Sequence, residues 1–183
     1  MDALLALSRA IDRVNLFVGR AVSWLVLVVV LISAGNAISR KLFDVSSNAW
    51  LEIQWYLFSA IFLLAAGYTL LQGEHVKVDV IFGRLRRRAQ LWIELFGTLF
   101  FLLPFSIIPI LLTWPIVASK FASGETSGNA GGLILWPVWM LIPIGFFLLG
   151  LQGISELIKR IAILTGKLPD TAEEVSEAEA APL

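Results

Sequence analysis

The sequence predicts an all-α membrane protein with four transmembrane helices. Four apolar runs of about 18 to 27 residues, over 21–38, 50–71, 91–117 and 133–151, are each long enough to cross the roughly 30 Å hydrocarbon layer as a helix. Hydrophobic residues make up 58% of the chain and charged residues only 15%, against about 25% charged in a typical soluble domain. The length of 183 residues suits one four-helix unit, residues 1–168, without a second domain.

Basic residues indicate which side of the membrane each end of a span faces. Eleven of the fourteen Lys and Arg residues lie before the first span, between the second and third, or after the fourth. Lysine and arginine concentrate on the cytoplasmic side of membrane proteins. We therefore expect both termini and the middle loop to be cytoplasmic. The two outer connections hold only Arg40, Lys41 and Lys120.

The segment before the first span has the pattern of an amphipathic helix over about residues 3–17. Apolar residues recur there at three- and four-residue spacing, and polar residues fall mainly on other faces. The apolar positions are Leu4, Leu7, Ile11, Val14 and Val18, and the polar ones are Asp2, Ser8, Arg9, Asp12 and Asn15. We expect this helix to lie in the cytoplasmic interface.

The third and fourth spans are expected to depart from simple straight rods. A straight third span would measure about 40 Å and overshoot the hydrocarbon layer, and it contains Pro104, Pro109 and Pro115, each of which lacks an N–H. We expect it to bend or tilt. The fourth helical pattern continues to about residue 165, and the acidic tail, 169–183, is expected to be disordered.

The cytoplasmic loop between the second and third spans combines a short apolar stripe with a cluster of arginines. The cluster consists of Arg84, Arg86, Arg87 and Arg88. Such a cluster is typical of contact with anionic lipid, and a partner-binding surface is an equal alternative.

Two carboxylates, Glu52 and Glu94, are the only ionisable residues inside the apolar runs, each within about one turn of an end. A carboxylate in a membrane is a functional hypothesis by default, but shallow positions favour a structural role. Glu52 lies near Arg40 across the short outer loop and is interpreted either as a tether between neighbouring helices, with Arg40 as its candidate partner, or as a contact with a partner protein. Glu94 is interpreted as reaching cytoplasmic water or pairing with an arginine.

Several functional classes are excluded or disfavoured. A formal net charge of +0 gives no reason to expect nucleic acid as a partner. The chain has no cysteine, and its one histidine, His75, cannot form a bis-histidine haem site, so we expect no metal, no cofactor and no enzyme. A complete carrier usually shows paired repeats and interrupted helices around a midplane site. Without such features, the pattern favours an accessory or scaffold subunit.

The stretch 48–79, NAWLEIQWYLFSAIFLLAAGYTLLQGEHVKVD, resembles the core signature of the small membrane subunit of tripartite ATP-independent periplasmic (TRAP) transporters, the DctQ-like family. The resemblance extends over all four spans. The matching residues are Arg40, Trp50, Glu52, Ala65, Ala66, Gly67, Gly73, His75 and Asp79. Many members carry a second glutamate after the first, where this chain has Ile53. The stretch Asn129-Ala-Gly-Gly with Trp136 and Pro137 is similar to a branch associated with organic or keto acids.

The resemblance implies a scaffold subunit in the bacterial inner membrane. Such a subunit braces a large multi-span subunit that carries the substrate and sodium sites, while a periplasmic binding protein delivers organic acids, among them keto or hydroxy acids. The hypothesised contacts with a partner or between helices are Arg40, Trp50, Glu52, Trp55, His75 and Asp79. Two alternatives remain open: a small homo-oligomeric proton-coupled carrier using Glu52 or Glu94, and the membrane anchor of a redox complex.

Overall fold

The computed structural model describes residues 1–44, 47–73, 85–129 and 131–170. Within these ranges the chain is helical apart from loops and one isolated antiparallel bridge between Thr126 and Ile134. The elements are α1 (Asp2–Phe43), α2 (Asn48–Gln72), α4 (Arg87–Gly97), the π-helical turn η1 (Thr98–Leu102), α5 (Leu103–Ser123) and α6 (Trp136–Leu164).

Four helical rods are long and apolar enough to cross a membrane. They are α1, α2, the continuous rod from α4 through η1 to α5, and α6. This confirms the all-α fold with four spans that the apolar runs predict. The fourth rod ends at Leu164, one residue from the expected limit.

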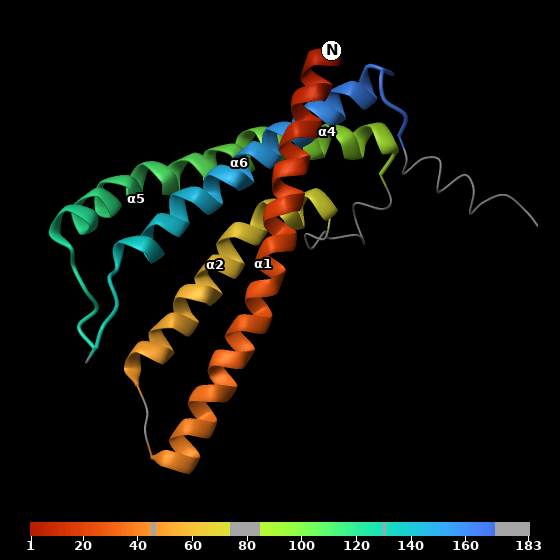
Figure 1. Ribbon diagram of the computed structural model, residues 1–183. Coiled ribbons are helices and arrows are strands. Elements are labelled where there is room, and N and C mark those ends of the chain that lie inside the picture. The colour runs from red at the N-terminus through yellow and green to blue at the C-terminus, as the bar shows by residue number, and fades with distance from the viewer. Residues whose placement is uncertain (45–46, 74–84, 130, 171–183) are drawn as a thin grey trace, which may run out of the picture.

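The rods form two antiparallel hairpins that meet at one end. Helices α1 and α2 make one hairpin, and α5 and α6 make the other (Figure 1). The hairpins diverge from a crossing where the C-terminal part of α6 packs against the N-terminal part of α1 (Figure 1). The connection between α5 and α6 returns toward the start of α2 (Figure 1). Polar contacts form there and, at the other end of the fold, where α6 crosses α1.

Helix α1 differs from the arrangement expected for the N-terminal segment. Residues 3–17 and the first span form one uninterrupted helix of 42 residues. No proline lies within it, and Gly19, at the junction, packs so closely on the Tyr68 ring that an added Cβ would collide with it. That the first part lies in the interface stays a prediction.

The third rod departs from α geometry just before its first proline. Over Thr98–Leu102 the helix is of the π type, and the Leu103 N–H donates to the Thr98 carbonyl five residues earlier. Pro104 follows at once, with no N–H to continue the α pattern. Pro109 and Pro115 are retained inside the helix, and the Thr113 hydroxyl donates to the Pro109 carbonyl at 2.6 Å.

Glycines allow α2 to approach both of its neighbours. A Cβ on Gly67 would collide with the Asn15 side chain of α1 and would lie 3.1 Å from the Leu148 carbonyl oxygen of α6. A Cβ on Gly145 of α6 would lie 2.6 Å from the Leu63 carbonyl oxygen of α2. Small residues at such crossings let helix backbones pack closely in a membrane.

The buried side chains are unusually polar, and the outer surface is apolar. The largest fully buried side chains are Gln152, Asn15, Ser8, Ser106 and Ser155. Large apolar side chains, in contrast, are exposed along all four rods, as expected for helices surrounded by lipid or by another membrane protein. The interior is therefore held together partly by hydrogen bonds.

Candidate functional site

At one end of the fold, Glu52 fixes the connection between α5 and α6. Glu52 is the fifth residue of α2 and is 2% exposed. Its Oε1 accepts hydrogen bonds from the Ser127 hydroxyl and from Asn129 Nδ2, the latter at 2.6 Å, and its Oε2 accepts from the Leu133 N–H at 2.8 Å. We call these four residues the Glu52 clamp. The clamp ties two hairpins together through one carboxylate.

The loop that the Glu52 clamp holds is also ordered from within. The Ser127 N–H donates to the Leu133 carbonyl at 2.9 Å, and the Leu135 N–H donates to the Glu125 carbonyl at 3.0 Å. The Tyr56 hydroxyl, one turn along α2 from Glu52, donates to the Ile134 carbonyl at 3.1 Å. The loop therefore presents a fixed surface at this end of the molecule.

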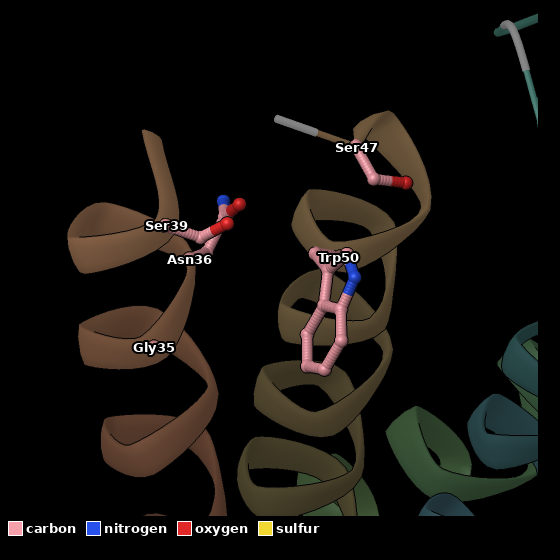
Figure 2. Close-up of a pocket in the computed structure, with 5 residues that line it drawn as sticks. All are labelled: Gly35, Asn36, Ser39, Ser47 and Trp50. Atoms are coloured by element: carbon pink, nitrogen blue, oxygen red, sulfur yellow. The ribbon is translucent and has the colours of Figure 1, made fainter. Parts of the chain in front are cut away.

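A small notch lies beside the clamp, between the end of α1 and the start of α2. Its volume is about 220 Å³, and its lining consists of Gly35, Asn36, Ser39, Ser47 and Trp50. The Asn36 and Ser39 side chains project from α1 toward α2, where Trp50 lies along the opposite wall (Figure 2). The notch offers amide and hydroxyl groups beside an exposed indole.

At the opposite end, polar side chains join α1 to α6. Gln152 is fully buried; its Nε2 donates to Asp12 Oδ1 at 2.8 Å, and its Oε1 accepts from Asn15 Nδ2 at 3.0 Å. The Ser155 hydroxyl donates to Asp12 Oδ1 at 2.7 Å. Because a hydroxyl has one proton to give, Ser8 must be the donor in its 2.7 Å bond to Ser155.

An alternating row of charges continues from this contact across α6 to α4. Lys159 Nζ lies 3.2 Å from Asp12 Oδ2 and also pairs with Glu156. Arg160 pairs with the same Glu156, and its Nε donates to Glu94 Oε2 at 2.8 Å. We call Asp12, Lys159, Glu156, Arg160 and Glu94 the charged network. It links three helices, and its Glu156, Arg160 and Glu94 side chains are only 13 to 16% exposed.

A further ion pair closes this end of the fold. Arg87, in the first turn of α4, donates from Nε and Nη2 to the two carboxylate oxygens of Asp170, at 2.6 and 2.8 Å. A two-pronged pair of this kind is the strongest geometry for an arginine and a carboxylate. It holds the segment after α6 against α4.

The structure brings few of the sequence-predicted contact residues together. Glu52 bonds to the loop rather than to Arg40, which is exposed and makes no ion pair within the described ranges. The two were expected to be close because the connection between α1 and α2 is short, but the carboxylate of Glu52 is taken up by donors of the α5–α6 loop, and Arg40 lies exposed near the end of α1. Trp50 lines the notch, whereas Trp55 is 64% exposed on another face of α2.

The remaining predicted residues divide between the arginine cluster and the undescribed loop. Arg87 pairs with Asp170, and Arg86 and Arg88 are exposed beside it. His75, Asp79 and Arg84 lie outside the described residues, as does most of the acidic tail. Glu94, named as an alternative proton carrier, is paired with Arg160. Within the described ranges, no group of three or more acidic, histidine or cysteine side chains could hold a metal ion.

Sequence reasoning missed most of the partners in both polar clusters. It placed Ser8, Asp12 and Asn15 on the solvent side of an interfacial helix, but Ser8 and Asn15 are buried against α6, and Leu4 and Leu7 are about half exposed. A signal was present in α6, because its polar positions also recur at three- and four-residue spacing. Those positions are Gln152, Ser155, Glu156 and Lys159.

Comparison with known proteins identifies the family. Residues 27–163 match the family model described as tripartite ATP-independent periplasmic transporters, DctQ component. The match covers three of the four helical rods in full or nearly so, together with residues 27–43 of α1, and it includes both Glu52 and Glu94. The searches of curated proteins and of solved structures gave no match. With four membrane-length helices and a family match over most of its length, the chain belongs to the DctQ component family of TRAP transporters, as a small transporter subunit and not an enzyme.

Proposed function

We propose that this chain is the scaffold subunit of a sodium-driven TRAP transporter and braces the large membrane subunit during uptake of organic acids. Membership of the family implies association with a large membrane subunit and a periplasmic binding protein. The scaffold role, the sodium coupling and the substrate class, with keto or hydroxy acids as first candidates, are the proposal.

The observation that carries the scaffold role is how the intramembrane carboxylates are used. Glu52 accepts three hydrogen bonds that join α2 to the α5–α6 loop, and Glu94 pairs with Arg160 to join α4 to α6. In the small-carrier alternative, Glu52 or Glu94 would exchange a proton during transport, as carboxylates do in the proton relays of transporters. These two instead hold helices to each other, which favours a rigid body over a moving one.

The outward surface supports the same proposal. Exposed aromatic side chains on the rod from α4 through η1 to α5 make a broad apolar face. Among them Trp92 lies tilted against Phe96, and Phe96 stacks on Phe100, with ring centroids 6.0 and 5.7 Å apart. A second membrane protein can pack on such a face without exposing polar groups to lipid.

The two ends of the fold then have different partners. By the distribution of basic residues, the Glu52 end faces the periplasm and the charged network faces the cytoplasm. The clamped loop and the notch beside Trp50 would meet the binding protein as it delivers solute. A fixed loop loses little conformational entropy on docking, which favours its use as a contact surface.

Reconstitution tests the scaffold role directly. Proteoliposomes under an inward sodium gradient would hold this chain alone, the large subunit alone, or both, each with binding protein and labelled organic acid. We expect uptake only when both subunits are present. Uptake by this chain alone would overturn the proposal and favour the small-carrier alternative.

A pair of variants separates bracing from proton exchange. Glu94→Gln retains the size of the side chain but cannot titrate, and it keeps an oxygen to accept from Arg160. We expect the two-subunit transporter with this variant to keep most of its uptake, whereas a proton-exchanging Glu94 would lose it. Glu94→Leu, which removes the contact to Arg160, serves as the matched control and should lower the yield of assembled complex.

A further inference from the structure

Three neighbouring cavities share lining residues, and we call them together the groove. The first lies between α4, α6 and the segment after α6, and the other two lie between α2, the third rod and α6. The first, of about 350 Å³, lies among charged side chains that include Arg87, Lys159 and Arg160. The second, of about 560 Å³, shares Glu94 and Arg160 with the first. The third, of about 180 Å³, shares Phe105 and Leu149 with the second. The three cavities therefore follow one another from a charged mouth to an apolar floor, with the Glu94–Arg160 ion pair between the first and the second.

The dimensions of the groove match a lipid chain. Along α6 it extends from Arg160 to Gly145, which corresponds to about 22 Å of helix rise. One leaflet of a membrane has roughly 15 Å of hydrocarbon, half of the bilayer core. A chain that begins at the mouth can therefore lie in the groove over the full depth of one leaflet.

The narrow end of the groove suits a hydrocarbon chain. The deepest cavity holds about 180 Å³ and is lined by apolar residues such as Phe62, Ala66 and Phe146. A helix, about 10 to 12 Å across with its side chains, could lie over this cavity but not within it.

The charge at the mouth selects the headgroup. Three basic and three acidic side chains line the first cavity, and they balance: Arg87, Lys159 and Arg160 against Glu94, Glu156 and Asp170. Arg86 and Arg88 flank Arg87, are exposed, and form no ion pair within the described part of the chain. With Arg86 and Arg88 included, the side chains near the mouth therefore carry a net positive charge, which favours a lipid with a negatively charged phosphate.

We propose that this groove is a binding site for one anionic phospholipid, with the headgroup at the mouth beside Arg86 and Arg88 and an acyl chain over Gly97 toward Gly145. This lipid-binding site does not depend on the proposed role of the chain in transport.

Native mass spectrometry of the purified full chain tests the site, with phosphatidylglycerol and phosphatidylcholine as probes. Gly97 lines the groove, and a Cβ added there would meet nothing within 4 Å. The side chain of Gly97→Leu therefore starts in open space and extends into the groove. By displacing about two methylene groups of lipid, it should weaken retention of phosphatidylglycerol about tenfold.

A matched control and a headgroup variant complete the test. Gly35, on α1, has equally open space around it and lies outside the groove, so Gly35→Leu should retain lipid as the unmodified chain does. The double change Arg86→Gln and Arg88→Gln should abolish the preference for phosphatidylglycerol over phosphatidylcholine. Unchanged retention in Gly97→Leu, or no headgroup preference in the unmodified chain, would overturn the proposal.

The assembled transporter distinguishes lipid from a protein occupant. The chain has no cysteine, so a Gly97→Cys variant carries a single thiol in the groove. Crosslinking of this thiol to the large subunit would show that a partner helix fills the groove and would refute the lipid site. Crosslinking to a thiol-reactive phosphatidylglycerol analogue, competed by unmodified phosphatidylglycerol, is the expected result.

Discussion

At the Glu52 end, one carboxylate is held by neutral donors from a single loop, whereas at the other end three carboxylates and two cations link three helices. The Glu52 clamp consists of hydrogen bonds from a hydroxyl, an amide and a backbone N–H. The charged network alternates sign from Asp12 to Glu94. The first arrangement fixes a loop, and the second fixes the crossing angle of helices.

This difference teaches how the same kind of residue serves two purposes in one membrane protein. A carboxylate surrounded by neutral donors needs no counter-charge, so the loop can be positioned without bringing a cation into the outer half of the fold. A row of alternating charges is mutually neutralising, and it lowers the cost of placing each charge near lipid. The two ends should therefore respond differently to substitution and to salt.

The largest expected effect tests the helix crossing next to the charged network. Gly67→Ala would force a Cβ into the Asn15 side chain and close to the Leu148 carbonyl, which should lower the free energy of unfolding by about 1 to 3 kcal/mol. Gly35→Ala, where the space is open, should instead raise it by up to about 1 kcal/mol. Unfolding in mixed micelles measures both, and equal effects would contradict the packing account.

The next effect tests whether the charged network couples α4 to α6. Arg160→Gln leaves Glu94 and Glu156 without their shared cation. Because these side chains are only 13 to 16% exposed, we expect the free energy of unfolding to fall by about 1 to 2 kcal/mol, between the values for exposed and buried pairs. A double-mutant cycle with Glu94→Leu, which removes the contact to Arg160, should give a coupling free energy of about 1 kcal/mol. A coupling indistinguishable from zero would show that the pair is incidental.

A smaller, local effect is expected at the Glu52 clamp. Glu52→Ala frees the Leu133 N–H and the Ser127 and Asn129 side chains, while leaving the helix crossings intact. Amide hydrogen exchange over 126–134 should accelerate by about tenfold or more, because local opening governs exchange in loops. Exchange in the part of α6 that carries Gln152 should not change. Faster exchange at both ends would mean that the clamp supports the whole fold.

The smallest effect separates the two ends by their response to salt. Raising the ionic strength from about 0.05 to 0.5 M should reduce the Lys159–Asp12 coupling by a few tenths of a kcal/mol, because both side chains are about one quarter exposed. The loop exchange controlled by Glu52 should not change with salt. Double-mutant cycles at two salt concentrations give the first quantity, and hydrogen exchange gives the second.

The sequence allowed the four spans to be predicted because each long apolar run can satisfy its own backbone only as a helix in a membrane. Glu52 and Glu94 could be selected for the same reason, as rare charges inside those runs. Periodicity, however, shows which residues share a face and not which face meets another helix. The stripe of Ser8, Asp12 and Asn15 was therefore recognised as polar, but its partner on α6 was not.

The Glu52 clamp was beyond prediction for a different reason. Its donors, Ser127, Asn129 and the Leu133 N–H, lie in a glycine-rich loop, and such a loop can adopt many backbone conformations. Its conformation depends on the carboxylate that it surrounds, and that carboxylate is more than 70 residues away in sequence. Arg40 was the nearer candidate along the chain, but distance along the chain gave the wrong partner.

The unbroken length of α1 has a practical consequence for work with this subunit. Its 42 residues span about 63 Å, roughly twice the hydrocarbon thickness of a bilayer. Because Ser8 and Asp12 near its start are bonded to α6, the first turns of α1 are fixed against the rest of the fold. A bulky fusion attached at Met1 would disturb these contacts, so affinity tags and fluorescent reporters belong at the other terminus.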